Sequence, residues 1–254
     1  MIRWDRLCAA ILWRNGRVGF RFLTYTISKN ALALPVYYYL HCRTFPAGEA
    51  ADSFPQHGIH LPSNPMRVIA GTYRSRRLIA PRGLATRPTS DRLRETLFNI
   101  LATRIEGAVF ADLYAGSGAV GIEALSRGAR LVYFVDNAAP AVAAIRENLA
   151  ALEIRSGFKI ESGSVSGALR RLSESSPDER CAIVFLDPPY AAVDAYAHTL
   201  TSVGQHADSL LTPSGIVVAE HGRKMQSPLA AHYGPLQRYR VLEQGDAGLS
   251  FYGR

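Results

Sequence analysis

The chain has 254 residues, of which 48% are hydrophobic and 20% charged, so it can fill a large core and is not a globally disordered chain. It contains no run of 18 uncharged apolar residues, which excludes a membrane-spanning helix, and its three cysteines are too few and too widely spaced for a disulfide framework. The formal net charge of +8 favours a polyanionic partner.

The positive charge is concentrated in one segment. Residues 66–110 contain nine arginines and three acidic side chains, whereas residues 111–254 contain 13 basic and 15 acidic side chains. Arginine guanidinium groups bind phosphates and stack on bases. This distribution predicts that residues 66–110 contact nucleic acid, with a solvated basic surface as the alternative.

Residues 1–65 differ from the rest of the chain. Their two apolar runs, 7–13 and 31–40, predict neither a helix nor a strand, and residues 44–65 contain four prolines in a linker-like composition. We therefore expect an extension that is either disordered, specific to this lineage, or upstream of a true start at Met66. If the true start is Met66, we expect deletion of residues 1–65 to leave activity unchanged.

From Met66 onward, strand and helix signals alternate. A helix N-cap signal stands at Ser90-Asp91, and this helix is expected to carry Arg92 on its outer face with Arg94 nearby. The alternation predicts an α/β fold with a doubly wound, mostly parallel sheet and an antiparallel C-terminal hairpin around Gly245-Asp246. Strands are expected at 67–71, 109–113, 131–135, 158–161, 181–186, 216–220, 238–243 and 249–252, and helices at 91–101, 119–127, 140–152, 165–172 and 196–211.

A glycine-rich turn follows the expected strand 109–113. Gly116, Gly118 and Gly121 permit a tight turn and a close approach of a ligand to the following helix. Asp136, 20 residues past Gly116, ends the next strand and can accept hydrogen bonds from both hydroxyls of a ribose. The pattern predicts a nucleoside cofactor site, and a purely structural turn is the alternative.

Asp112 indicates which cofactor binds there. It lies four residues before Gly116, where a carboxylate suits the ammonium group of S-adenosylmethionine and would repel the pyrophosphate of NAD. The sequence therefore favours S-adenosylmethionine, with a capping role for Asp112 as the alternative.

A second motif, Asp187-Pro188-Pro189-Tyr190, follows the apolar strand 181–186, at an edge where parallel sheets bind ligands. The prolines fix the backbone and remove two N–H donors, which leaves the Asp187 carboxylate and the Pro188 carbonyl as acceptors beside the Tyr190 ring. Such a pocket suits a planar base whose exocyclic amine attacks a sulfonium methyl group without a metal. The alternative is a rigid turn with a packed tyrosine.

The pairing of these two motifs resembles class I amino-methyltransferases. The segments Met66–Gly71 (MRVIAG) and Arg87–Asn99 (RPTSDRLRETLFN) are similar to the RsmD family, and the resemblance covers residues 66–252. It implies a seven-stranded Rossmann-like sheet and methylation of the exocyclic N2 amine of a guanine in 16S rRNA. It further implies a cytoplasmic protein whose partner is 16S rRNA or the small ribosomal subunit. Nothing in the sequence demands more than a monomer, and no membrane partner is expected.

The resemblance also implies the roles of individual residues. It assigns residues 66–106 to a segment that contacts RNA and residues 107–254 to the catalytic domain, which binds S-adenosylmethionine. Ser164 departs from the acidic residue common at its position, and no metal is expected. The implied S-adenosylmethionine contacts are Asp112, Tyr114, Gly116, Gly118, Asp136, Asn137 and Ser164, the target-base contacts Asp187, Pro188, Pro189 and Tyr190, and the RNA contacts Arg74, Arg76, Arg77, Arg87 and Arg92.

Three alternatives remain at this point. The acceptor-rich loop also suits adenine N6 in DNA or RNA. An NAD-dependent oxidoreductase explains the glycine turn but leaves the loop at Asp187 without a role. A non-catalytic RNA-binding protein explains the arginines but not the two complete motifs.

Overall fold

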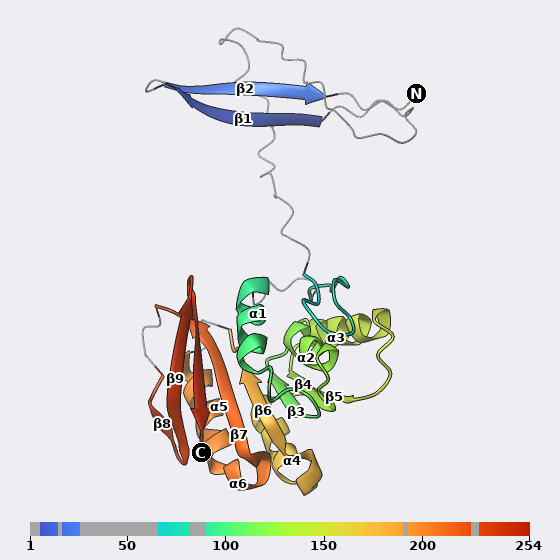
Figure 1. Ribbon diagram of the computed structural model, residues 1–254, viewed down its shortest axis with the longest axis vertical. Helices are drawn as coiled ribbons and strands as arrows, with labels where there is room; N and C mark the ends of the chain where they lie inside the picture. The colour runs from blue at the N-terminus through green and yellow to red at the C-terminus, as the bar shows by residue number, and fades with distance from the viewer. Residues whose placement is uncertain (1–5, 15–16, 26–65, 82–89, 190–192, 225–228) are drawn as a thin grey trace. The chain divides into compact units, whose positions relative to one another are not determined.

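The computed structural model of the chain describes residues 6–14, 17–25, 66–81, 90–189, 193–224 and 229–254 (Figure 1). The chain divides into two units, Met1–His60 and Leu61–Arg254.

In the first unit, strands β1 (Arg6–Arg14) and β2 (Arg17–Tyr25) form an antiparallel hairpin. The apolar runs of residues 1–65 had indicated no regular element, and the structure has a hairpin there. The sequence does contain a strand signal in this region. Large apolar residues at Val18, Phe20 and Phe22 alternate with smaller or charged ones, and this period of two indicates a strand.

The described part of the second unit is built on an eight-stranded sheet, in the order β5-β4-β3-β6-β7-β10-β9-β8. The first five strands in this order are parallel, and β10, β9 and β8 continue the sheet antiparallel. The strands are β3 (Val109–Leu113), β4 (Leu131–Asp136), β5 (Phe158–Ser162), β6 (Cys181–Leu186), β7 (Leu211–Gly222), β8 (His232–Tyr233), β9 (Leu236–Gln244) and β10 (Ala247–Gly253). The doubly wound α/β fold with its C-terminal hairpin is confirmed.

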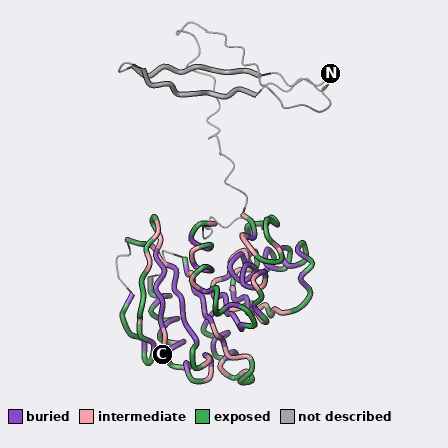
Figure 2. The backbone as a smooth tube through the Cα atoms, in the orientation of Figure 1, coloured by how far each residue is buried: buried purple, intermediate pink, exposed green. Residues whose placement is uncertain are grey.

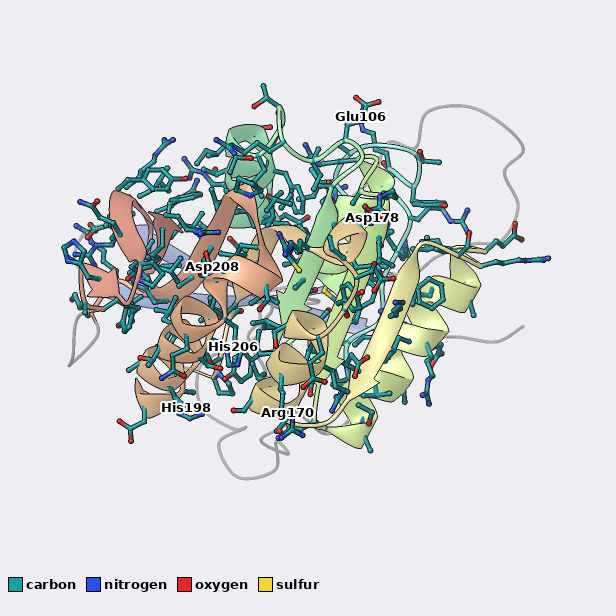
Figure 3. All side chains as sticks on the ribbon, turned by 90° about the horizontal axis from the view of Figure 1, so that it is seen from below. Glu106, Arg170, Asp178, His198, His206 and Asp208 are labelled. Carbon is teal, nitrogen blue, oxygen red and sulfur yellow. The ribbon has the colours of Figure 1, made fainter. Side chains whose placement is uncertain are left out.

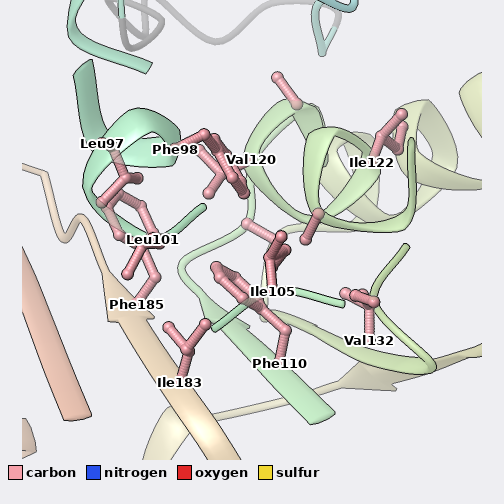
Figure 4. Close-up of a cluster of buried hydrophobic side chains, with 14 of the residues drawn as sticks. Leu97, Phe98, Leu101, Ile105, Phe110, Val120, Ile122, Val132, Ile183 and Phe185 are labelled. Carbon is pink, nitrogen blue, oxygen red and sulfur yellow. The ribbon is translucent and has the colours of Figure 1, made fainter. Parts of the chain in front are cut away.

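Helices cover both faces of the sheet. One layer contains α1 (Asp91–Ile100), α2 (Ala119–Ser126) and α3 (Ala139–Ala151); the other contains α4 (Val165–Ser173), α5 (Val193–Gln205) and α6 (Ala207–Leu210), with a short 3-10 turn at η1 (Pro177–Glu179). Successive strand residues point to opposite layers, so Phe110 packs on the α1 side and Ala111 on the α5 side. Figure 2 shows buried backbone concentrated in the central strands, and Figure 4 shows Phe110 beside Ile105 and Ile183.

Four element predictions need correction. The expected strand 67–71 is only a backbone bridge between Arg67 and Arg77, because the N–H groups of Ile69 and Ala70 donate to a side chain. The expected helix 196–211 is divided at His206 into α5 and α6. Strand β7 begins at Leu211 rather than at 216. The sheet has one strand more than expected, because the two residues of β8 are too few for a detectable pattern.

Candidate active site

The predicted site residues follow parallel strands at the same end. The carboxyl ends of parallel strands meet at one edge of a sheet, so the loops after β3, β4, β5 and β6 converge there. Figure 3 views the molecule from below, where Glu106, Asp178 and Asp208 precede β3, β6 and β7 at the opposite edge.

The glycine turn after β3 has the left-handed backbone that its sequence predicts. Gly116 and Gly118 have φ values of +56° and +75°, and Tyr114 adopts φ +63° although it is not glycine. Gly121 is required by packing, since a Cβ there would lie 2.3 Å from Cε1 of Phe134. Tight packing between α2 and β4 therefore fixes the start of the helix against the sheet.

Asp112 lies beneath this turn. It is buried, with 2% of its surface exposed, and its Oδ2 accepts the Gly121 N–H at 2.8 Å. Burial raises the pKa of Asp112 to about 8, and the nearby carboxylates of Asp136 and Glu220 act in the same direction. The structure thus gives Asp112 the capping contact that the sequence left as the alternative, and its contact with the cofactor stays a prediction.

We expect Asp112 to make stability pH-dependent. The pKa of Asp112 is raised from 3.8 to about 8, so between these values the folded state binds more protons than the unfolded state. The free energy of unfolding should therefore fall by up to about 1.4 kcal/mol per pH unit between pH 6 and pH 8 and level off above pH 8. Chemical denaturation across this range measures the slope. Asp112→Asn should flatten it, and an equal slope in this variant would contradict the account.

Asp136 joins the glycine turn to the loop after β4. Its Oδ2 accepts the Gly116 N–H at 2.8 Å and its Oδ1 accepts the Ala138 N–H at 2.9 Å. Each carboxylate oxygen has a further lone pair that can accept a ribose hydroxyl. The next predicted contact, Asn137, is exposed on the same loop.

Ser164 lies at the start of α4, after β5. It is exposed, and its Oγ accepts the Gly167 N–H as the N-cap of the helix. The structure therefore gives Ser164 a structural role, and its contact with the adenine of the cofactor stays a prediction.

The loop after β6 begins beside the glycine turn. Asp187 donates its N–H to the Leu113 carbonyl at 3.4 Å, so the two motifs start at adjacent positions of neighbouring strands. Asp187 is half-buried, Pro188 is buried and Pro189 is exposed. Tyr190 lies outside the described residues.

Helix α5 contacts both loops through two hydroxyl groups that the sequence analysis missed. The Tyr196 hydroxyl donates to the Pro188 carbonyl at 3.2 Å, and the Tyr114 hydroxyl lies 2.8 Å from Oγ1 of Thr199. Tyr196 and Thr199 are each 1% exposed and three residues apart, so they lie on the same helix face. Two hydroxyl side chains three residues apart on an otherwise apolar helix face could have marked Tyr196 and Thr199 as candidates, but this spacing does not predict their partners.

The segment 66–81 is anchored by buried polar groups. The Glu123 carboxylate accepts the N–H groups of Ile69 and Ala70 at 2.7 and 2.9 Å, and it pairs with Arg127 at 2.7 Å. Arg94 is fully buried, donates to the Arg67 carbonyl and lies 4.0 Å from Glu123. Arg92 is exposed, as expected, but Arg94, which was expected near it, is buried on the inner face of α1.

A second anchor connects this segment to the glycine turn. The side-chain amide of Asn148 on α3 donates to the carbonyls of Ile79 and Ser117 at 3.0 and 2.9 Å. The arginine-rich segment is thereby held next to the predicted cofactor loop.

Most of the predicted RNA contacts are at the surface. Arg74, Arg77 and Arg92 are exposed, and Arg76 is exposed while it donates to the Ala151 carbonyl at 2.7 Å. Arg87 lies outside the described residues.

The described ranges contain no candidate metal centre and no candidate membrane span. No group of three or more His, Cys, Asp or Glu side chains there is arranged to hold a metal ion. No helix among those residues has the length and apolar character needed to cross a membrane.

The strand order, the glycine turn after β3 and the acceptor-rich loop after β6 define a class I methyltransferase fold, whose enzymes use S-adenosylmethionine. Residues 66–253 match the family described as conserved hypothetical protein 95, and the chain belongs to this family. The resemblance expected from residues 66–252 and the methyltransferase class are thus confirmed.

Three similar proteins illustrate the relationship. YlbH of Bacillus subtilis, named as a predicted rRNA methyltransferase, is 35% identical over 187 residues, which are 74% of this chain and 98% of that protein. Ribosomal RNA small subunit methyltransferase D of Escherichia coli K12 is 38% identical over 131 residues, 52% of this chain and 63% of that protein. The structure of a predicted methyltransferase, yhhF, from E. coli matches with a TM-score of 0.61 and 27% identity, covering 75% of this chain and 98% of that one.

Proposed function

We propose that this protein transfers the methyl group of S-adenosylmethionine to the exocyclic N2 amine of a guanine in 16S rRNA of the small ribosomal subunit. The observation that carries the proposal is the contact between the two motifs. The Asp187 N–H donates to the Leu113 carbonyl, so the base-binding loop and the cofactor loop leave the sheet from adjacent strands. A nitrogen held by one loop can then reach a methyl group held by the other.

The charges at this edge suit S-adenosylmethionine better than NAD. The carboxylates of Asp136 and Glu220 are close enough to raise the pKa of the buried Asp112, so this edge holds three acidic groups. A bound cation would favour the ionised form of Asp112. Carboxylates attract the ammonium and sulfonium groups of S-adenosylmethionine and repel a pyrophosphate. When bound, this cofactor supplies a methyl group that is already activated for transfer, so no metal is required.

The residues after β6 would hold and orient the attacking amine. The Asp187 carboxylate and the Pro188 carbonyl accept its two N–H groups and direct the nitrogen lone pair toward the methyl group. The Tyr196 hydroxyl, at 3.2 Å from the Pro188 carbonyl, keeps that acceptor in place. The amine loses one proton on transfer, which the Asp187 carboxylate would receive.

The arginines of segment 66–81 support an RNA substrate. Comparison with ribosomal RNA small subunit methyltransferase D supports 16S rRNA in particular. Such a substrate would place the enzyme in the cytoplasm. We further propose that the protein acts as a monomer.

Binding and label transfer together test the proposal. We expect S-adenosylmethionine, and not NAD, to bind the full chain, and the labelled methyl group to enter unmodified 16S rRNA offered free or in small subunits. Label in DNA but not in RNA would favour the adenine-N6 alternative. NAD binding without methyl transfer would favour the oxidoreductase.

We expect the exposed arginines of segment 66–81 to bind phosphates. Replacing Arg74, Arg76 and Arg77 by alanine should weaken RNA binding and lower the slope of log affinity against log salt by about 2–3, because each lost phosphate contact removes about 0.7–0.9 from the slope. Filter binding at several salt concentrations measures this slope.

The control for these arginines is Arg170→Ala. Arg170 is exposed on α4, in the other helix layer, and is labelled in Figure 3. An unchanged slope in the triple variant, or an equal loss in the control, would contradict the assignment.

A further inference from the structure

Strand β9 has a bulge that places an aromatic ring beside a guanidinium group. Phe251 of β10 pairs with Arg240, and the next residue, Tyr252, pairs with Arg238, so Tyr239 is the extra residue of β9. A bulge sets two successive residues against one residue of the partner strand and changes the direction of a side chain. Tyr239 and Arg240 therefore both oppose Phe251.

Contacts with Phe251 confirm this arrangement. The rings of Tyr239 and Phe251 have centroids 6.3 Å apart at 47°, and Cζ of Arg240 lies 5.7 Å from the centroid of the Phe251 ring. Phe251 is fully buried, whereas 58% of the Tyr239 surface is exposed. The strand thus carries an exposed aromatic ring and a guanidinium side by side, in the layer that contains α1.

A second guanidinium, that of Arg104, follows α1 and bonds to the start of β7. Nη1 of Arg104 donates to the Ser214 carbonyl at 3.1 Å, which holds the arginine against the start of β7. Burial raises the pKa of the Tyr239 hydroxyl, and the charges of Arg104 and Arg240 oppose this rise, so both charges act on the tyrosine. We call Arg104, Tyr239 and Arg240 the Tyr239 patch.

The Tyr239 patch is unusual for this surface. Among the described residues, only three large hydrophobic side chains are exposed, namely Ile79, Tyr239 and Val241. None of the ion pairs between described residues includes Arg104 or Arg240. An aliphatic side chain could pack over Phe251 in place of Tyr239. Packing over Phe251 therefore does not explain why the exposed residue beside these two arginines is a tyrosine.

We propose that the Tyr239 patch is a second RNA-contacting surface, on which an unpaired base of the substrate stacks on Tyr239 while Arg104 and Arg240 contact the flanking phosphates. An aromatic platform within a positive surface is the arrangement that binds single-stranded nucleic acid. The patch lies on the sheet face that α1 covers, but Arg104 follows the end of α1, toward the edge where β3 and β7 begin. The patch would therefore contact a part of the RNA away from the target base. This inference rests on the proposed RNA substrate.

The decisive variant is Tyr239→Leu, because leucine still covers Phe251 but offers no aromatic face. Stacking on an aromatic side chain contributes about 1–3 kcal/mol per base, so the Kd and the KM for RNA should rise by about 5- to 150-fold. The kcat at saturating RNA and the affinity for S-adenosylmethionine should not change. Tyr239→Phe should behave as the wild type.

Val241→Ala is the matched control. Val241 is 48% exposed on the same strand, but it pairs with Ser250, whose side chain points away from the Phe251 face. Arg104→Gln and Arg240→Gln should each lower the salt slope of RNA binding by about 0.7. Arg104→Gln leaves the contacts of Phe251 intact, so it tests the patch even where a Tyr239 variant folds poorly.

The outcomes separate this inference from the proposed function. A wild-type enzyme that methylates RNA, together with Tyr239→Leu and Arg104→Gln variants that bind and use RNA as well as the wild type, would overturn the patch alone. A wild-type chain that neither binds nor methylates RNA would overturn the proposed function. Thermal unfolding of each variant identifies losses that come from folding.

Discussion

Asp187→Ala is expected to lower kcat for RNA methylation by about 100- to 1,000-fold, the loss typical of removing one preorganised polar contact to a reacting group. Asp187 is the first residue after β6, and its N–H contacts the end of β3, so the proposed base loop begins beside the proposed cofactor loop. The affinities for S-adenosylmethionine and RNA should stay within a few-fold, because the contact is used chiefly in the transition state. Single-turnover kinetics at saturating RNA measures the effect.

A nearby carboxylate provides the control for this variant. Asp194 is exposed in the first turn of α5, seven residues further along the chain. Asp194→Ala should retain the wild-type rate. A kcat for Asp187→Ala within threefold of the wild type would remove Asp187 from the proposed mechanism.

The largest effect on stability is expected for Glu123→Ala, which should lower the free energy of unfolding by about 3–5 kcal/mol. Removing this buried carboxylate leaves the fully buried Arg94 without its nearest buried negative charge. It also leaves the N–H groups of Ile69 and Ala70 without their acceptors. The segment that carries the proposed RNA contacts would lose its main anchor.

Chemical denaturation measures this loss, and Glu147→Ala is the matched control because Glu147 is exposed on α3. The control should change stability by less than about 0.5 kcal/mol. Glu123→Ala should also weaken RNA binding at temperatures where the protein stays folded. A loss of less than 1 kcal/mol in the Glu123 variant would contradict the anchoring role.

Local signals made most of the fold predictable. The Ser90 cap, the glycine turn at Gly116 and the apolar run 181–186 each specify an element from adjacent residues, and the structure has these elements at the expected positions. Alternating strands and helices then leave few topologies, because parallel crossovers are right-handed. The motifs at Asp112 and Asp187 converge for the same reason, since parallel strands end at one edge.

Contacts between distant residues were not predictable. Arg94 and Glu123 are 29 residues apart. The sequence alone does not distinguish Arg94 from the surface arginines around it, because its partner Glu123 is distant in the chain. The N–H groups of Ile69 and Ala70 bind that carboxylate instead of a neighbouring strand, which is why the expected strand did not form. Thr199 contacts Tyr114 over 85 residues, and no periodic pattern encodes such a hydrogen bond.

The central claim is that the two loops bring a guanine N2 amine to the methyl group of S-adenosylmethionine. The most direct test is to methylate unmodified 16S rRNA, free and in small subunits, with the full chain, to digest the RNA and to identify the modified nucleoside by mass spectrometry. We predict N2-methylguanosine at a single position, and none with Asp187→Ala. A methylated adenosine, or a labelled protein with unlabelled RNA, would contradict the claim.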